Sequence, residues 1–284
     1  MTSIKTSALP LLTAFALMGH AHGAVVTDDF TSGYPSGGSG WLTSWNTYTY
    51  RGPTTATVEN THPFSSGGNY LHVNYTDNVN NSGGVSIVSR AFDPNAVSIS
   101  APETVSFNIR LDAATHWDST NEILAVYAGS SSTTLRGSYA ALTNTWSLEY
   151  DGLNGWQVLS GDGSGSVLYT AASTPLLSAA DGNTVYAVTV QVDPGTRKFT
   201  VSISDGTRTE NWGNGAFSFI DPSATTAGNY LSFYSHVRYG VSIDYSVDNV
   251  AVVPEASSLS LTVAGAIGIG LLGKGIAGRS QAKK

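Results

Sequence analysis

The feature that most restricts the fold of this chain is a β-hairpin between Tyr186 and Ser204. Apolar and polar residues alternate along both halves, with Tyr186, Val188, Val190 and Val192 in the first half and Phe199, Val201 and Ile203 in the second. Successive side chains of a strand point to opposite faces, so each half has one buried face. Asp193-Pro194-Gly195-Thr196 lies between them, where proline presets φ and glycine can take positive φ. The pattern predicts two antiparallel strands joined by a tight turn.

The same alternation recurs through most of the chain, and no long amphipathic pattern of helical period interrupts it. The segment 105–111 alternates, and Ile123–Ala128 is a short apolar run typical of a central strand. Further strand candidates are 25–30, 55–59, 70–75, 85–91, 146–150, 155–159, 167–170, 230–234 and 245–252. About a dozen short strands separated by clusters of turn residues predict an all-β, two-sheet sandwich. There is no fixed-period repeat, so a solenoid or a propeller is not expected.

The first 23 residues are typical of a signal peptide. Lys5 supplies a positive start, and Ala8–Met18 is an apolar stretch that is too short to span a membrane. Ala21-His22-Gly23 offers small residues at the two positions that a signal peptidase reads, so we expect cleavage after Gly23. The alternative is a buried N-terminal helix.

Residues 254–284 indicate a second targeting segment. Leu259–Leu272 is a predominantly apolar run, and as a helix it would be about 21 Å long against a hydrocarbon core of about 30 Å. Extending it through Ala277 gives about 28 Å, so we expect a transmembrane helix over about 257–277. Four basic residues and no acidic residue follow Leu272, which places the C-terminus in the cytoplasm. The alternative is a buried helix that belongs to the sandwich.

Val253-Pro254-Glu255 stands directly before this tail. The short motif, the apolar run and the basic end together resemble a PEP-CTERM sorting signal, the tail of bacterial exosortase substrates. This chain has Ala256 where that family usually has a second proline. The resemblance covers about the last tenth of the chain. It implies an exosortase-type processing enzyme as a partner, anchoring of the tail in the cytoplasmic membrane, and a body that is exported or released at the cell surface.

The body between the two ends, residues 24–253, is acidic. It contains 19 acidic and 8 basic residues, for a net charge of −11, and Lys198 is its single lysine. A body of this charge should repel nucleic acid and anionic membrane surfaces. The chain has no cysteine, which excludes disulfides and thiol chemistry. A length of 230 residues is normal for a single β-sandwich.

The body opens with Asp28-Asp29-Phe30 and closes with Val247-Asp248-Asn249-Val250. These motifs resemble the concanavalin A-like or laminin G-like jelly rolls of bacterial surface proteins. The resemblance implies a jelly-roll β-sandwich over 24–253 in which the first and last strands pair. That pairing would bring Asp28, Asp29 and Asp248 together as oxygen ligands for Ca²⁺. The alternative is that these residues cap strand ends by accepting hydrogen bonds from nearby backbone N–H groups.

Glu149-Tyr150-Asp151-Gly152-Leu153 is similar to the Glu-x-Asp-x-Glu strand motif of the laminarinases and lichenases, which share the concanavalin-like fold. Alternate carboxylates on one strand would face one cleft. Leu153 replaces the third carboxylate, so the acid/base partner is missing. We therefore expect a protein that is not an enzyme. A glycoside hydrolase or lyase that acts on polysaccharide is the alternative.

Trp117 with Asp118, and Trp41 with Trp45, are the candidates for ligand binding. They lie in polar or glycine-rich segments, where an exposed ring beside a carboxylate would suit stacking on a sugar and hydrogen bonds to its hydroxyl groups. The alternative for each is ordinary core packing. We expect an exported, non-enzymatic cell-surface or extracellular-matrix protein with weak, Ca²⁺-assisted affinity for neutral or weakly charged extracellular polysaccharide. A purely structural surface protein is the other possibility.

Overall fold

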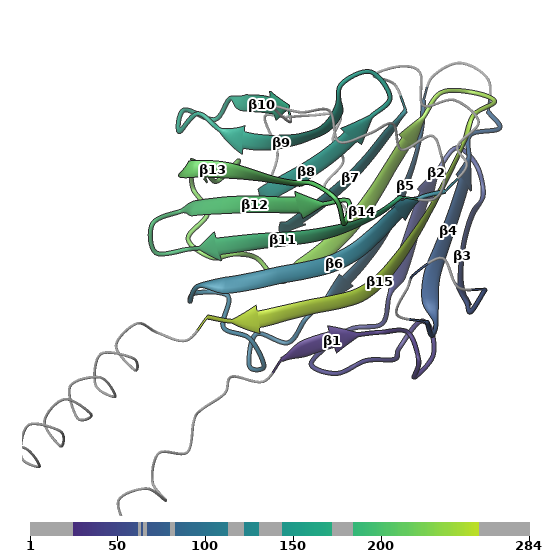
Figure 1. The fold of residues 1–284 in the computed structure, drawn as a ribbon, viewed down its shortest axis with the longest axis horizontal. Helices are drawn as coiled ribbons and strands as arrows, with labels where there is room; N and C mark the ends of the chain where they lie inside the picture. Colours follow the sequence, from purple (N-terminus) through teal and green to yellow (C-terminus); the bar gives the residue numbers. More distant parts are fainter. Residues whose placement is uncertain are drawn as a thin grey trace, which may run out of the picture.

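The computed structural model describes residues 25–61, 64, 67–79, 83–112, 122–130, 144–171 and 184–255. These residues form 15 β-strands, all in one antiparallel sheet that folds over into two layers (Figure 1). The two layers meet where Ser218 pairs with Gly161. The predicted signal peptide and the predicted transmembrane helix lie outside the described residues. Within the described part of the chain, no element is a helix with the length and apolar character that a membrane span requires.

We call the two layers the back sheet and the front sheet, according to the view in Figure 1. The back sheet contains, in spatial order, β2 (Asn46–Tyr50), β5 (Gly84–Ala91), β14 (Tyr230–Val237), β7 (Ile123–Gly129), β8 (Asn144–Asp151) and β9 (Gly155–Gly161), with β10 (Val167–Ala171) beside β9. The front sheet contains β13 (Thr209–Ser218), β12 (Lys198–Ser204), β11 (Val185–Asp193), β6 (Glu103–Leu111), β15 (Ser242–Pro254), β4 (Tyr70–Thr76) and β3 (Thr54–Glu59), with β1 (Val26–Asp28) beside β15. The predicted all-β sandwich is confirmed.

The core lies between the two sheets and follows from the alternation of the strands. On β6 and β12, every second side chain is buried, and the side chains between them are half-buried on the outer face. Aromatic rings join the layers: Phe107 on β6 packs edge-on to Phe233 on β14 with ring centroids 5.6 Å apart. Trp156 on β9 meets Tyr186 on β11 at 5.3 Å. Rings of this size supply much of the apolar surface that the sandwich buries.

The predicted hairpin is confirmed as β11 and β12, which pair from Ala187↔Ser204 to Asp193↔Lys198. Its turn differs in one detail. Arg197 takes the left-handed conformation with φ of 54°, and Gly195 does not. The Asp193 carboxylate accepts hydrogen bonds from the backbone N–H groups of Gly195 and Thr196. This local bonding fixes the turn, and the residue before the return strand takes the left-handed position, as in longer hairpin loops.

The first and last strands pair, as predicted. Val26 lies opposite Val252 and Asp28 lies opposite Val250. A β-bulge between Asp248 and Ala251, with Asn249 at φ of 52°, shifts the register of β15 against β6. On its other edge, β15 pairs with β4 over residues 242–247 and with β1 over residues 250–252. β15 therefore holds three strands of the front sheet together.

Candidate ligand-binding site

Asp28 forms a buried ion pair and not an open ligand site. Its Oδ2 accepts a hydrogen bond from Arg90 Nη1 at 2.6 Å and one from Trp45 Nε1 at 2.8 Å. Its Oδ1 accepts the backbone N–H of Phe30 at 2.9 Å. Arg90 also donates to two backbone carbonyl groups, so both charges are satisfied inside the protein. The pair joins the end of β1 to β5 of the back sheet, and the bonds to Trp45, Gly37 and Thr43 hold the loop after β1 against both strands.

The predicted stacking surface of Trp41 and Trp45 packs into the same region. Arg90 lies over the Trp41 ring at 4.8 Å from its centroid and over the Trp45 ring at 5.9 Å. Trp45 is only 4% exposed and packs against Phe233 of the back sheet. The structure therefore places Trp45 in the core and not on the surface, because its indole N–H is satisfied by Asp28 and its ring fills space between the sheets. Trp41 is half-buried beside it.

Asp29 and Asp248, the other predicted Ca²⁺ ligands, bond to nearby backbone. Asp29 accepts from the N–H and hydroxyl of Thr31, which lowers the pKa of its carboxyl group. Asp248 accepts from the N–H and side-chain amide of Asn249. Among the described residues, no three His, Asp or Glu side chains lie together in a way that could hold a metal ion. These contacts match the capping alternative, and the Ca²⁺ site stays a prediction.

The other predicted ligand-binding residues, Trp117 and Asp118, lie outside the described residues.

The two carboxylates of the Glu-x-Asp motif, Glu149 and Asp151, lie on one face of β8. Gln157 bridges them, with its Nε2 3.2 Å from Glu149 Oε1 and 3.0 Å from Asp151 Oδ2. Both carboxylates are buried, and Asp151 also accepts the N–H groups of the turn that ends β8. Neither carboxylate is exposed in an open cleft.

A polar cluster on the outer face of the front sheet is the best candidate for a functional site. Strand register brings its members together: His72 on β4 lies opposite Ser246 on β15, which lies opposite Arg110 on β6. We define the His72 cluster as Glu59, His72, Asn74, Arg110, Asp112, Asp244 and Ser246. None of its spacings along the chain, for example from residue 72 to residue 244, indicates a site. The one available signal is that several of these polar residues occupy the outward positions of alternating strands.

The centre of the cluster is an imidazole held between two carboxylates. His72 Nδ1 lies 2.9 Å from Glu59 Oε1, and His72 Nε2 lies 3.5 Å from Asp244 Oδ1. The side chains of His72, Glu59 and Asp244 are 27%, 37% and 24% exposed, respectively. Each is thus reachable from solvent and yet fixed by its neighbours.

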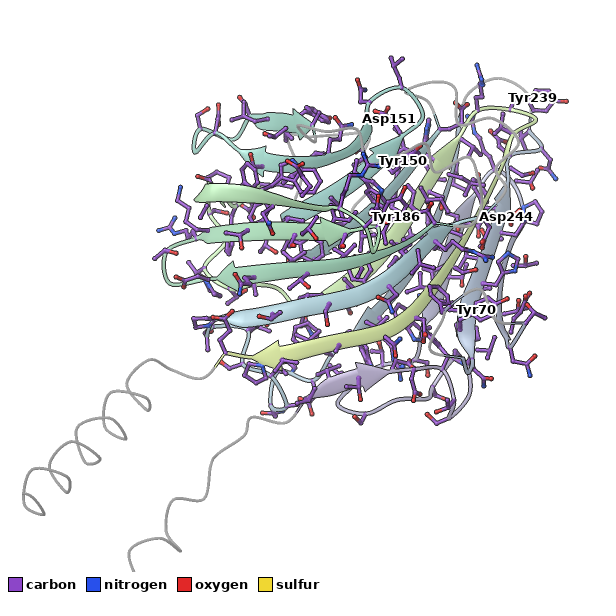
Figure 2. All side chains as sticks on the ribbon, viewed as in Figure 1. Tyr70, Tyr150, Asp151, Tyr186, Tyr239 and Asp244 are labelled. Atoms are coloured by element: carbon purple, nitrogen blue, oxygen red, sulfur yellow. The ribbon has the colours of Figure 1, made fainter. Side chains whose placement is uncertain are left out.

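Further hydrogen bonds orient the carboxylates of the cluster. Tyr70 Oη donates to Glu59 Oε2 at 3.0 Å, and Asn74 donates to Asp244. Arg110 and Ser246 both donate to Asp112. Figure 2 labels Tyr70 and Asp244, which come from the neighbouring strands β4 and β15. Because each carboxylate already has a donor, the cluster is a preorganised set of polar groups and not a group of unpaired charges.

The ionisation of His72 and Glu59 is coupled. The hydrogen bond to Asp244, helped by the nearby Glu59, raises the pKa of His72 against the opposing effect of burial. Burial acts to raise the pKa of Glu59, but the hydrogen bond from Tyr70 and the charge of His72 outweigh it and lower that pKa. His72 therefore keeps its proton to a higher pH than a free imidazole does.

An uncharged surface continues from the His72 cluster across β6, β11 and β12. Register aligns Thr104, Gln191 and Thr200 in one row and Ser106, Thr189 and Ser202 in the next. We define the hydroxyl face as Thr104, Ser106, Asn108, Thr189, Gln191, Thr200, Ser202 and Ser204. All of these side chains are exposed or half-buried, and none is ionisable. The front sheet thus presents a regular array of neutral hydrogen-bonding groups beside the cluster.

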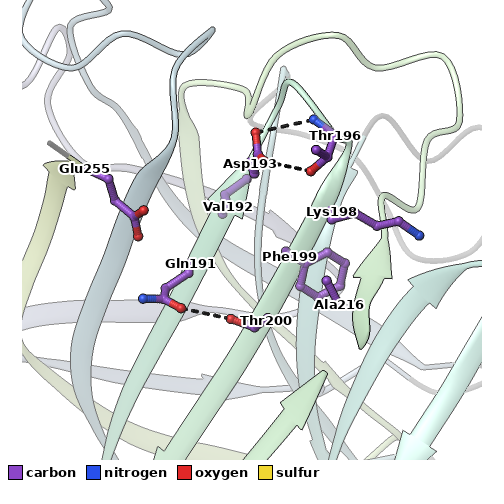
Figure 3. Close-up of a pocket in the computed structure, with 9 residues that line it drawn as sticks. All are labelled: Gln191, Val192, Asp193, Thr196, Lys198, Phe199, Thr200, Ala216 and Glu255. Carbon is purple, nitrogen blue, oxygen red and sulfur yellow. Dashed lines mark hydrogen bonds between the residues drawn. The ribbon is translucent and has the colours of Figure 1, made fainter. Parts of the chain in front are cut away.

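A pocket of about 230 Å³ lies at the far end of the hydroxyl face, near the β11–β12 turn (Figure 3). It is lined by Gln191, Val192, Asp193, Thr196, Lys198, Phe199, Thr200, Ala216 and Glu255. Figure 3 shows Glu255 at one side of this pocket and Lys198 at the other. Lys198 Nζ donates to Ser218 Oγ at 2.9 Å. The pocket is smaller than most small-molecule sites, so we treat it as a border of the hydroxyl face.

Comparison with known proteins gives only distant likenesses. No family model matches the chain, and no curated protein sequence does. Lectin II from Ulex europaeus is 13% identical over 83% of this chain and 100% of its own, with a TM-score of 0.43. A family 11 carbohydrate-binding module from Clostridium thermocellum, in complex with a mixed-linked tetrasaccharide, is 14% identical over 81% and 97%, with a TM-score of 0.34. A carbohydrate esterase from bacteriophage phi24B is 14% identical over 82% and 99%, with a TM-score of 0.44. Scores at this level carry no argument about function.

Proposed function

We propose that this protein is an exported, non-enzymatic surface or matrix protein that binds carbohydrate through the outer face of its front sheet. The observation that supports this most is the His72 cluster, in which the partly exposed side chains of His72, Glu59 and Asp244 are held in place by their own hydrogen bonds. Sugar hydroxyl groups both donate and accept hydrogen bonds. The carboxylates of the cluster can accept from them, and its amide and imidazole groups can donate to them. Groups that are already ordered lose little conformational freedom when a ligand binds.

The charge of this face favours neutral glycans over polyanions. Glu59, Asp112 and Asp244 place three carboxylates in the cluster against Arg110 and His72, and the adjacent hydroxyl face has no charge. The body as a whole carries a net charge of −11. An anionic polymer would be repelled at this surface unless a cation bridged it. The Ca²⁺ assistance expected at Asp28, Asp29 and Asp248 remains part of the proposal, with Asp29 and Asp248 as its ligands, since the Asp28 carboxylate is bonded to Arg90.

Sorting to the cell surface rests on the two ends of the sequence. The signal-peptide pattern of residues 1–23 and the Val253-Pro254-Glu255 tail support export, an exosortase-type partner and anchoring in the cytoplasmic membrane. A concanavalin-type jelly roll is the finer fold that we propose for the sandwich. The pairing of Val26 with Val252 supports it, because the start of β1 and the end of β15 then lie side by side where the chain enters and leaves the sandwich.

A glycan array tests the binding proposal. The sandwich, residues 24–255, would be screened with and without Ca²⁺, followed by Asp244→Asn, His72→Ala and Trp117→Ala. We expect binding of neutral glycans that Asp244→Asn weakens about tenfold or more, since hydrogen bonds to charged groups contribute about 1.5–3 kcal/mol. Asp162→Asn, in the β9–β10 turn, removes the same charge away from the front sheet and should leave binding unchanged.

Other outcomes of the same screen separate the alternatives. No binding in either buffer would remove the carbohydrate proposal and favour a structural surface role. Binding that survives EDTA would remove the Ca²⁺ role. Binding that survives Trp117→Ala would remove Trp117 as a contact. Turnover of β-glucans by the purified sandwich would show an enzyme.

A further inference from the structure

The motif Val253-Pro254-Glu255 belongs to the sandwich and not to a free linker. Val253 lies opposite Thr104, and Pro254 lies opposite Glu103, at the start of β6. Glu255 then donates its backbone N–H to the carbonyl oxygen of Pro102 at 2.9 Å. Its Oε1 accepts a hydrogen bond from Thr104 Oγ1 at 3.0 Å. All three residues of the motif are therefore held against β6.

The chain just before the motif is anchored more firmly. Val252 is fully buried in the core and pairs with Val26 on β1. Val253 itself is 37% exposed, so its side chain reaches solvent while its backbone stays in the sheet. Within the described residues, the sandwich thus ends in a short paired segment that the contacts of Glu255 close.

Enzymes that act on a peptide segment commonly bind it as an extended strand, through its main-chain hydrogen-bonding groups and its side chains. The Glu255 N–H group and carboxylate are already bonded to β6. We propose that this junction is an autoinhibitory clamp: an enzyme that recognises Val253–Glu255 engages it only in molecules whose β15 end has separated from β6. The clamp itself follows from these contacts, and only the identity of the enzyme, a processing enzyme for the tail, rests on the proposed sorting function.

The clamp can open without unfolding of the whole sandwich. Pro254 has no N–H group, so it adds no donor to the pairing. Opposite it, Glu103 is fully buried, and neither of its carboxyl oxygens has a hydrogen-bond partner among the described residues. Burial of an unpaired carboxyl group costs free energy, which weakens the sheet at this end. The two bonds made by Glu255 therefore add to the pairing of Val253 with Thr104 in holding this end of β15 against β6.

Thr104 gives a matched pair of variants. Thr104→Val keeps the shape of the side chain and removes the bond to Glu255, whereas Thr104→Ser keeps the hydroxyl group. Thr200→Val is a control on the same face, since Thr200 bonds to Gln191 and not to Glu255. The probe is a glutamyl endopeptidase acting on the full chain, because cleavage after Glu255 requires its side chain to leave the clamp. We expect cleavage there to be several-fold faster in Thr104→Val than in the wild type, Thr104→Ser or Thr200→Val.

Equal cleavage rates in the wild type and Thr104→Val would overturn the clamp, and so would fast hydrogen exchange of the Glu255 amide in the wild type. Processing of the tail in native cells, followed by mass spectrometry, should show the same order of variants. If the protease distinguishes the variants but no tail is processed in cells, the clamp stands and the proposed sorting function fails.

Discussion

At the scale of single residues, Glu103 should make stability depend on pH. Burial raises the pKa of this carboxyl group from 4.5 to about 8. The folded state then binds the proton more tightly than the unfolded state, so the cost of burying Glu103 is smallest below pH 4.5 and the fold loses stability as pH rises to about 8. A shift of this size corresponds to at most about 5 kcal/mol. Urea unfolding at pH 5 and pH 9 should show that Glu103→Gln removes this part of the dependence. Equal pH dependence in both proteins would contradict the prediction.

The buried pair of Asp28 and Arg90 gives a second prediction at this scale. Asp28→Asn leaves the Arg90 guanidinium buried without its counter-charge and should lower the free energy of unfolding by about 3–5 kcal/mol. Replacing both residues, with Asp28→Leu and Arg90→Met, should cost less than the sum of the two single changes. Chemical denaturation of the wild type, Asp28→Leu, Arg90→Met and the double variant measures the coupling. Additive losses would show that the pair is not coupled.

A third residue-scale prediction concerns His72. Its pKa should lie above the ordinary value of 6.5, mainly because of the hydrogen bond to Asp244. Asp244→Asn should therefore lower the pKa of His72 more than Glu59→Gln does. Titration of the imidazole by NMR measures both shifts. The ion pairs of His72 stabilise the fold below pH 6.5 and are lost as pH rises through its raised pKa. An unchanged pKa in Asp244→Asn would contradict the geometry of the cluster.

At the scale of elements, the bulge in β15 allows one strand edge to serve two partners. Asn249 takes positive φ there, a conformation that asparagine and glycine tolerate better than other residues. Asn249→Ala should lower the free energy of unfolding by about 1–2 kcal/mol, whereas Asn249→Gly should change it by less. Thermal unfolding of the two variants compares them directly. An equal loss in both would mean that the side chain of Asn249, through its bond to Asp248, matters more than its backbone conformation.

The sequence predicts those strands whose own residues show the pattern. β11 and β12 are predictable because each buries every second side chain. β2 is missing from the sequence prediction, since none of Asn46–Tyr50 is buried and the strand exists through its pairing with β5. β13 is missing too, because glycines at 213 and 215 interrupt its pattern. The His72 cluster escapes prediction for a related reason. Glu59, His72 and Asp244 meet only through strand register, which no local pattern encodes.

Functional residues were the least predictable. The aromatic residue Trp45 has the loop context of a surface ring, and its sequence neighbours give no sign of Arg90, which lies 45 positions away and packs against it. The sequence places Asp28 beside the last strand, and the partner that its carboxylate binds is also Arg90. In both cases a distant basic residue decides the role, and a single sequence does not reveal such a pairing.

At the scale of the whole molecule, β15 is the strand on which the front sheet depends. It pairs with β6 on one edge and with β4 and β1 on the other. A chain that ends at Val241 should therefore fail to fold, whereas a chain that ends at Glu255 should give a cooperative sandwich. Near-UV circular dichroism and resistance to proteolysis distinguish the two. A protease-resistant core in the shorter chain would contradict this dependence.

The position of β15 also determines when, during synthesis, the sheet can form. Translation makes the N-terminus first. Val26 is therefore synthesised long before Val252, the residue that lies opposite it in the folded sheet, and cannot pair until β15 has been made. Pairing across so much of the chain is slow, because a long loop must close before any contact forms. A ribosome that stops early, at a nonsense codon or a stall before residue 242, releases strands with open edges and no central partner. The open edges of such a product are templates for pairing with other chains, so we expect a truncated chain to aggregate.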